Sequence, residues 1–221
     1  MPREIELKLA VPDAALAAVA AWLDANGEAR GETTLLNVYL DTPARDLARQ
    51  RAALRLRQKG DQKGDQKGSQ WLQTLKTAGS SQGGMASRKE WECDVAGEAI
   101  ELSRFPDEAR AVLAPLADHL APVFRTDFVR RTWIVMQDGA RIEAALDTGK
   151  ITAPGQAQVE TIQELELEWL PGDDNGGADD SQLAEAALRA FAARLSHVAP
   201  LTPSDLSKAA RGYRLTGGEL S

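Results

Sequence analysis

Glu4-Ile5-Glu6-Leu7-Lys8-Leu9 opens the chain with a strict alternation of charged and aliphatic side chains. Because successive side chains of a β-strand point to opposite faces, this stretch predicts a strand with one charged face and one aliphatic face. Similar alternation returns in Leu54-Arg55-Leu56-Arg57, in Arg88-Lys89-Glu90-Trp91-Glu92 and in Glu164-Leu165-Glu166-Leu167-Glu168. A single strand of this kind would turn its charges to water, but the repetition in several strands favours a different arrangement.

The rest of the chain is read from the same periodicities and from turn residues. Eight strands are predicted, at residues 4–9, 33–41, 51–59, 71–77, 87–95, 125–137, 140–147 and 159–170. Their short connections, among them the hairpin turn favoured by Asp138-Gly139, indicate mostly antiparallel pairing. Helices are predicted at residues 12–26, 43–50, 106–120 and 181–197, with a last one starting at 202–205 and ending at Tyr213. Loops are predicted at residues 58–68, 78–84 and 171–180.

Closure of such a sheet into a barrel would explain the alternation. The aliphatic faces would pack outward against helices, and the charged faces would line a lumen wide enough for side chains or one small ligand. Carboxylates and guanidinium groups crowded together inside are costly unless a ligand and a metal ion satisfy them. The predicted fold class is therefore α+β, an eight-stranded antiparallel β-barrel wrapped by helices. The implied ligand is a polyanion with a divalent cation, because arginine suits phosphate and clustered carboxylates suit Mg²⁺ or Mn²⁺.

Composition narrows the class of protein further. The 221 residues include 33 acidic and 26 basic ones, a net charge of −7, which disfavours nucleic acid as a partner. One cysteine and two histidines exclude an internal disulfide and argue against structural zinc. The longest apolar run, residues 14–23, is too short to span a membrane, and the N-terminus lacks a signal-peptide pattern, so a cytoplasmic protein is predicted.

Taken in order, these motifs resemble the CYTH family, also called triphosphate tunnel metalloenzymes. The first strand carries an ExExK signature, and the other matching stretches are residues 37–43, 54–57, 74–76, 88–92, 130–133, 146–149, 164–168 and 208–213. The resemblance is strongest to bacterial inorganic triphosphatases, whose CYTH domain often precedes a helical CHAD domain. It implies one CYTH domain over residues 1–215, a tail at 216–221, and a CHAD domain as a potential partner in a longer chain.

The resemblance also implies roles for the charged residues. The catalytic residues would be Glu4, Glu6, Lys8 and Glu166. The ligands of Mg²⁺ or Mn²⁺ would be Glu4, Glu6, Glu164, Glu166 and Glu168. The phosphate-binding residues would be Lys8, Arg55, Arg57, Lys76, Arg88, Arg130, Lys208 and Arg211. Basic neighbours would be oriented by Glu90 and Asp147.

The expected activity is metal-dependent hydrolysis of inorganic triphosphate to pyrophosphate and phosphate. Within the same fold, the alternative is hydrolysis or cyclisation of an organic triphosphate, as in thiamine triphosphatases and class IV adenylate cyclases. Few aromatic residues and no evident base-stacking cluster favour the inorganic substrate. A non-catalytic polyphosphate-binding module is a further alternative, although such a module gains nothing from carboxylates in its site.

Overall fold

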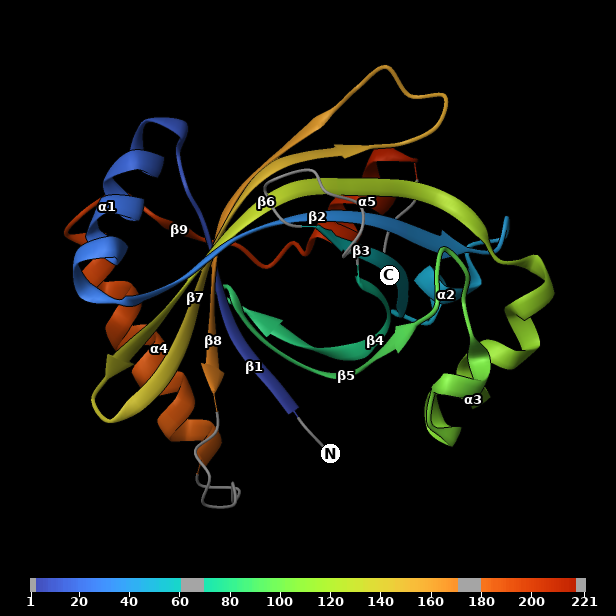
Figure 1. Ribbon diagram of the computed structural model, residues 1–221, viewed down its shortest axis with the longest axis horizontal. Coiled ribbons are helices and arrows are strands. Elements are labelled where there is room, and N and C mark those ends of the chain that lie inside the picture. Colours follow the sequence, from blue (N-terminus) through green and yellow to red (C-terminus); the bar gives the residue numbers. More distant parts are fainter. Residues whose placement is uncertain (1–2, 61–69, 171–179, 218–221) are drawn as a thin grey trace.

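The computed structural model describes residues 3–60, 70–170 and 180–217 (Figure 1), and at Arg3, Glu4, Ala78 and Asp180 it describes the backbone alone. The strands are β1 (Arg3–Ala10), β2 (Glu28–Asp41), β3 (Ala53–Gly60), β4 (Gln70–Gln82), β5 (Met85–Val95), β6 (Ala121–Gln137), β7 (Ala140–Thr152), β8 (Glu160–Leu170) and β9 (Thr202–Pro203). The α-helices are α1 (Leu16–Asn26), α2 (Asp46–Arg49), α3 (Asp107–Leu113), α4 (Asp180–Ser196) and α5 (Lys208–Leu215). Short 3₁₀ turns lie at Asp13–Ala15, Leu102–Arg104 and Ala114–His119.

The sheet closes on itself. Its strand order is β5-β4-β3-β2-β6-β7-β8-β1-β9, and β1 also pairs with β5. Eight strands therefore form a ring in which every pairing is antiparallel, while the short β9 adds to one end of β1. The predicted α+β fold, an eight-stranded antiparallel barrel wrapped by helices, is confirmed.

Aliphatic side chains of the barrel point outward to the helices, as the alternation predicts. On one side of the barrel (Figure 1), Leu7 and Leu167 join a core with Val19 and Leu23 of α1 and Phe191 of α4. These five side chains are at most 3% exposed. Burying each such side chain stabilises the fold by about 1.5–3 kcal/mol, and it forces the alternate residues of the same strands to face inward.

A second core lies on the opposite side of the barrel, where α2 and α3 pack (Figure 1). There Leu54 of β3 and Leu75 of β4 meet Leu47 of α2, and they also meet Phe105 and Leu113 around α3. Because Leu54 and Leu75 face outward, their neighbours Arg55 and Lys76 must face the barrel interior.

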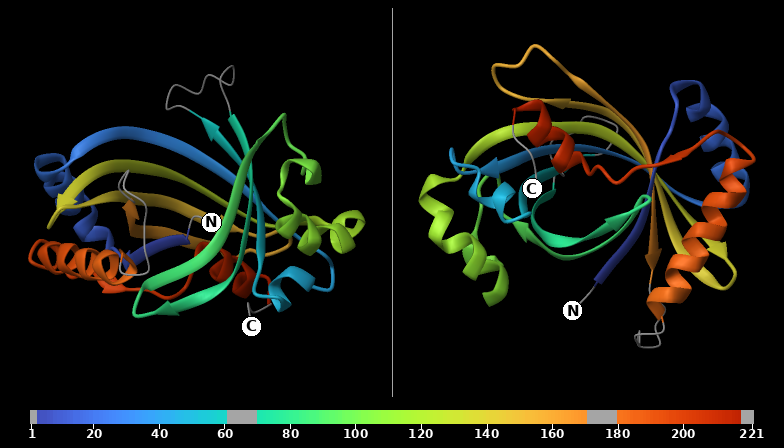
Figure 2. Two further views of the ribbon diagram at one scale, coloured as in Figure 1. Left: turned by 90° about the horizontal axis from the view of Figure 1, so that it is seen from below. Right: turned by 180° about the vertical axis from the view of Figure 1, so that it is seen from behind.

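The helix α5 packs against β6, β7 and β8, away from α1 and α4 (Figure 2). The ring of Tyr213 meets the ring of Phe124 edge-on at 5.1 Å, and the ring of Phe124 stacks on that of Tyr39 at 4.5 Å. The hydroxyl of Tyr213 donates to Asp41 Oδ2 at 2.9 Å, and Asp41 also accepts the backbone N–H of Leu47 in α2. A buried carboxylate thus joins α2 and α5.

Some local predictions were wrong. The predicted loop 78–84 belongs largely to β4, which continues to Gln82 and turns into β5 at Gly83 and Gly84, both with positive φ. The predicted helix start at 202–205 is instead β9 and a loop, because Pro203 pairs with Leu9 and α5 begins only at Lys208. The predicted loop 58–68 also begins too early, because residues 58–60 belong to β3, and the predicted loop 171–180 ends one residue too late, because Asp180 begins α4. The rest of these two loops, residues 61–68 and 171–179, lies outside the described residues.

Asp205 explains why the segment before α5 is not helical. Its carboxylate accepts from Ser81 Oγ at 2.8 Å and from the backbone N–H groups of Gly84 and Gly83 at 2.9 and 3.2 Å. This carboxylate therefore ties the β4–β5 turn to the segment that leads into α5. None of the helices in the described residues is both long and apolar enough for a membrane crossing.

Gly212 sits where α5 approaches β6 most closely, and a Cβ there would overlap the ring of Phe124. We expect Gly212→Ala to destabilise the protein by about 1–3 kcal/mol, the usual range for overpacking, although alanine is the better helix former. Thermal unfolding followed by circular dichroism tests this. Gly97→Ala is the control, because no atom lies within 4 Å of its added Cβ. Equal melting temperatures of the two variants would contradict the expectation.

Candidate functional site

The register of β1 and β8 sets opposite and like charges side by side in the barrel. Lys8 lies opposite Glu166, whereas Glu6 lies opposite Glu168. Directly opposed residues of antiparallel strands point to the same face, so these four side chains share the interior. On the other edge of β8, Glu143 lies opposite Glu168.

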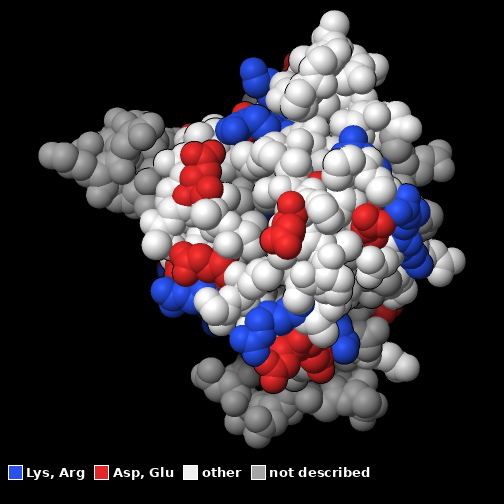
Figure 3. Space-filling view, turned by 90° about the vertical axis from the view of Figure 1, so that its right-hand side faces the viewer, with Lys and Arg blue, Asp and Glu red and all other residues white. Residues whose placement is uncertain are grey.

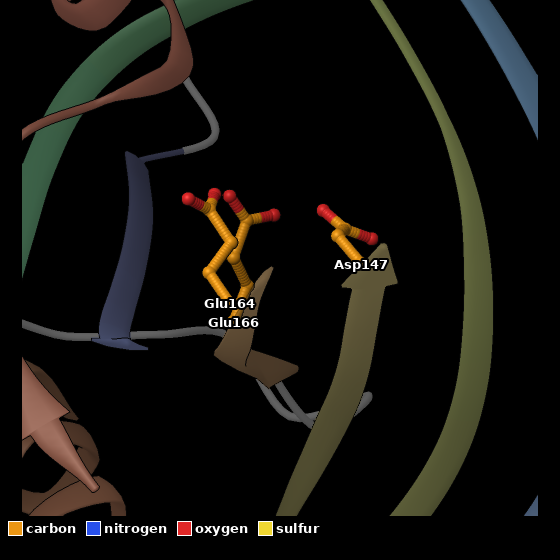
Figure 4. Close-up of side chains that lie close together, drawn as sticks. All are labelled: Asp147, Glu164 and Glu166. Carbon is orange, nitrogen blue, oxygen red and sulfur yellow. The ribbon is translucent and has the colours of Figure 1, made fainter. Parts of the chain in front are cut away.

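Three carboxylates from β7 and β8 form an acidic cluster inside the barrel (Figure 4). Asp147, Glu164 and Glu166 each bring an oxygen within 4.8 Å of the others. The ammonium of Lys208, at the start of α5, lies among them, with Nζ 2.5 Å from Glu164, 2.6 Å from Asp147 and 3.0 Å from Glu166. An ammonium therefore neutralises this cluster from within.

The pKa values follow from these contacts. Burial alone would lower the pKa of Lys208, but the three carboxylates outweigh burial and raise it. Burial alone would raise the pKa of Glu166, but Lys208, Arg130 and Lys8 hold it well below its ordinary value. Both groups are therefore ionised in the folded protein at neutral pH.

Two arginines extend the ion pairs around the cluster. Arg130 donates to both oxygens of Asp147 at 2.7 Å and also contacts Glu166. Arg211 of α5 donates to Glu164 Oε2 at 2.9 Å. Asp147 is fully buried and contacts both Arg130 and Lys208; its predicted role of orienting basic neighbours stays a prediction.

Glu6 and Lys8 of β1 are both buried in the interior. Lys8 Nζ is 3.9 Å from Glu6 and 3.7 Å from Glu166, and Arg88 of β5 also contacts Glu6. Burial would raise the pKa of Glu6, yet Lys8 and, more weakly, Arg88 leave it lowered. The side chain of Glu4, the first predicted metal ligand, lies outside the described part of the chain.

Basic groups of β3 and β4 face acidic groups of β5. Arg55 Nη2 donates to Thr74 Oγ1 at 2.9 Å and to Glu92 Oε2 at 3.2 Å. Lys76 Nζ lies 2.6 Å from Glu90, whose predicted role of orienting basic neighbours stays a prediction. Glu92 was not assigned a role from the sequence, although its place in the alternating stretch 88–92 already put it on the same face as Glu90.

Arg57 differs from these cations because it pairs with no carboxylate in the described residues. Its Nε donates to the amide oxygen of Asn37 at 2.6 Å, and its guanidinium lies 6.0 Å from the ring centroid of Phe128. Burial, together with the positive charges of Arg55 and Arg130, lowers the pKa of Arg57 to about 9. The guanidinium of Arg57 is thus held in the barrel without a salt bridge to any carboxylate of the described residues.

Glu168 is a half-buried carboxylate that has no cation within salt-bridge distance among the described residues. Burial and then the nearby charge of Glu143 raise its pKa to about 7, the ammonium of Lys76 opposes this rise, and Glu6 and Glu90 add to it more weakly. Carboxylate oxygens in excess of cations suit a divalent ion. Among the described residues, Asp147, Glu164 and Glu166 are the carboxylates close enough together to share a metal ion, and Lys208 lies among them, whereas Glu6, Glu168 and Glu143 follow one another across β1, β8 and β7.

The strand register and these contacts bring the predicted site residues together in the barrel interior. Those with described side chains are Glu6, Lys8, Arg55, Arg57, Lys76, Arg88, Glu90, Arg130, Asp147, Glu164, Glu166, Glu168, Lys208 and Arg211. Their metal-binding and phosphate-binding roles stay predictions. On the outer surface, acidic and basic side chains are interspersed over the face in Figure 3.

Fold and site together define a class: closed antiparallel barrels whose interior is lined by buried acidic and basic side chains. The sequence profile described as the CYTH domain matches residues 2–213. The chain belongs to the CYTH family.

Individual relatives agree with this assignment. An inorganic triphosphatase from Haemophilus influenzae is 32% identical over 220 residues, covering 97% of this chain and 55% of that protein. The chain thus spans about half the length of this curated relative. A protein from Hippeastrum, described as an adenylyl cyclase with a dominant triphosphatase activity, has a TM-score of 0.63 at 20% identity and covers 97% of this chain and 96% of its own. A Pyrococcus horikoshii protein has a TM-score of 0.60 at 17% identity, covering 93% and 96%.

We expect Lys208→Met to destabilise the metal-free protein by about 3–5 kcal/mol at pH 7, because it leaves three buried carboxylates without their ammonium. Urea unfolding in EDTA measures the change. Lys89→Met is the matched control: Lys89 is half-exposed and 3.7 Å from Glu108, so its loss should cost less than about 1 kcal/mol.

The loss in free energy of unfolding caused by Lys208→Met should become smaller as the pH falls from 7 to 4. In the native protein, the lowered pKa of Glu166 means that its ionised form stabilises the fold above its ordinary pKa of 4.5. That contribution is lost as the pH falls through the lowered pKa. Carboxylates without Lys208 protonate more readily and so recover stability in acid. A deficit that stays constant with pH would contradict the role of Lys208 as their counter-ion.

Proposed function

We propose that this protein hydrolyses inorganic triphosphate to pyrophosphate and phosphate with the help of a divalent metal ion. The observation that carries the proposal is that one barrel interior holds both a cation and a carboxylate without a salt-bridge partner among the described residues. Arg57 hydrogen-bonds to the neutral amide of Asn37 and to no carboxylate, and Glu168, which lies between Glu6 and Glu143 in the strand register, has no cation within salt-bridge distance. A polyanion bound with a divalent cation would satisfy both. The activities named for the Haemophilus and Hippeastrum proteins support the same substrate class.

The carboxylates of Glu6 and Glu168 would hold the metal ion, with Glu4 and Glu166 as further ligands on the same strands. Their donor atoms are hard oxygens, which is the set that Mg²⁺ and Mn²⁺ prefer. When bound, such an ion supplies neutralisation of the negative charge that develops on phosphate oxygens. Glu164 was also predicted as a ligand; it pairs with Lys208 and Arg211, just as Glu166 pairs with Lys208 and Arg130, so a metal ion bound by either carboxylate would have to displace a cation.

The remaining residues would bind and orient the substrate. Arg55, Arg57 and Arg130 lie on neighbouring walls of the barrel and present guanidinium groups that match phosphate oxygens. Water would attack the terminal phosphorus, the phosphoanhydride bond would break with pyrophosphate leaving, and a tunnel glutamate would accept the proton of the water. Fixed cations around the anion stabilise the transition state electrostatically.

Organic triphosphates are the second candidate, because the Hippeastrum relative is described as an adenylyl cyclase. Such a substrate needs a surface for its organic group. In the described interior, however, the rings of Tyr39, Phe124 and Tyr213 contact one another, and Phe128 lies beside cations. A non-catalytic polyphosphate binder is disfavoured by the carboxylates of the barrel. A CHAD domain as a partner in a longer chain stays a prediction.

Phosphate release from inorganic triphosphate, ATP and thiamine triphosphate, each with Mg²⁺, Mn²⁺ or EDTA, tests the proposal. We expect rapid release from inorganic triphosphate with metal and none with EDTA. Faster turnover of thiamine triphosphate or ATP would favour the second candidate, and metal-independent binding of triphosphate without turnover would favour the binding module.

Glu6→Gln should reduce kcat for inorganic triphosphate by about 100-fold or more, in line with the loss of one group that acts on transition-state charge. The substitution keeps the size of the side chain and removes its charge. Glu28→Gln, on the exposed start of β2, makes the same chemical change outside the barrel and should leave kcat unchanged. Similar kcat values for both variants would count against a role for Glu6.

A further inference from the structure

We propose that Asn37 is a positioning residue that holds the guanidinium of Arg57 ready for the phosphates of the substrate, an inference that rests on the proposed function. Asn37 was part of the sequence pattern at 37–43, but no role followed from it. In the structure it is fully buried in the middle of β2. It lies opposite Arg57 of β3 on one side and opposite Thr126 of β6 on the other.

The amide of Asn37 makes a different contact in each direction. Its oxygen accepts from Arg57 Nε at 2.6 Å, and its nitrogen donates to the backbone carbonyl of Thr126 at 2.5 Å. Because Nε–H can only donate and the carbonyl can only accept, these partners fix which way the amide faces. Arg57 is thereby anchored to the backbone of β6 through a neutral side chain.

Because the amide of Asn37 is neutral, it does not cancel the positive charge of Arg57. Among the interior arginines of the described chain, Arg55, Arg88, Arg130 and Arg211 all contact carboxylates, whereas Arg57 contacts an amide. The amide uses the Nε–H and leaves both terminal nitrogens of the guanidinium without a charged partner. A full positive charge thus stays available for an anion, in an orientation set before the anion arrives.

Two other polar atoms near Arg57 also lack partners. Thr126 Oγ1 and Arg55 Nε are buried without a hydrogen bond in the described structure. Thr126 is the residue opposite Asn37, and Arg55 is two positions from Arg57 on the same strand face. Buried polar groups are normally satisfied, so these atoms mark the same wall of the barrel as a place that receives a polar ligand.

The Asn37→Asp variant separates positioning from plain structural support. An aspartate still offers Arg57 an acceptor, so a purely structural contact would be kept or strengthened. Its charge, however, would pair with the guanidinium and compete with phosphate. We expect the KM for inorganic triphosphate to rise about tenfold to 100-fold, the range for a hydrogen bond to a charged group, with a smaller change in kcat. Calorimetric binding of triphosphate in EDTA should weaken in parallel.

Asn26→Asp is the matched control. It adds the same charge at the exposed end of α1, outside the barrel, and should leave both KM and calorimetric affinity unchanged. Should Asn37→Asp fail to fold, Asn37→Ala replaces it: alanine releases the guanidinium without adding charge, and KM should again rise. Wild-type KM and affinity in a folded Asn37→Asp or Asn37→Ala protein would overturn the inference.

A double-mutant cycle with Arg57→Ala shows whether Asn37 acts through Arg57. In this cycle Asn37→Ala is used, because it adds no charge: once Arg57 is absent, Asn37→Ala should change the affinity for triphosphate little, so the two effects should be far from additive. Additive effects would overturn the inference while leaving the proposed function intact. A folded wild-type protein that neither binds nor hydrolyses triphosphate would overturn both.

Discussion

Closure of the sheet through β1 and β5 is the constraint on which the rest of the structure depends. An open sheet could turn the charged faces of its strands to water. A closed ring with aliphatic residues packed outward has only its interior left for those charges, where water is scarce and their desolvation is costly. The barrel is therefore stable only if the charges compensate one another or receive a ligand that does so.

The interior charges compensate one another fully in one part of the barrel and incompletely in another, and this difference bears on function. Around Lys208, one ammonium satisfies three carboxylates, and Arg130 completes the network with two well-formed hydrogen bonds to Asp147. Elsewhere among the described residues the compensation is incomplete, because Arg57 hydrogen-bonds to a neutral amide and Glu168 has no cation within salt-bridge distance. An unpaired buried charge destabilises a fold, so the retention of Arg57 supports the proposed anionic ligand.

Period-two alternation was enough to predict the barrel and the face on which each charge lies, because side-chain direction along a strand is fixed by geometry. It could not predict pairing across strands. That Lys208 would enter the cluster of Asp147, Glu164 and Glu166 depends on where α5 docks, which in turn rests on Phe124, Tyr213 and Asp41.

Neutral residues were missed for a related reason. Asn37 carries no charge and occurs in an otherwise hydrophobic run, so nothing local marks it as a contact of Arg57. Only the register of β2 with β3 and β6 brings Arg57 and Thr126 to either side of it. The short β9 was missed as well, because Thr202-Pro203 is also a good helix start, and its pairing with Leu9 is set by tertiary structure.

The position of Lys208 at the start of α5 has a consequence for folding order. Strands β1 to β8 are complete by Leu170, yet the cation that neutralises their largest acidic cluster comes about forty residues later along the chain. During synthesis, the ring of strands emerges from the ribosome before its internal counter-charge does. A ring that closed before α5 docked would have to hold unpaired carboxylates or keep them protonated. The last helix, rather than the last barrel strand, therefore completes the fold of this chain.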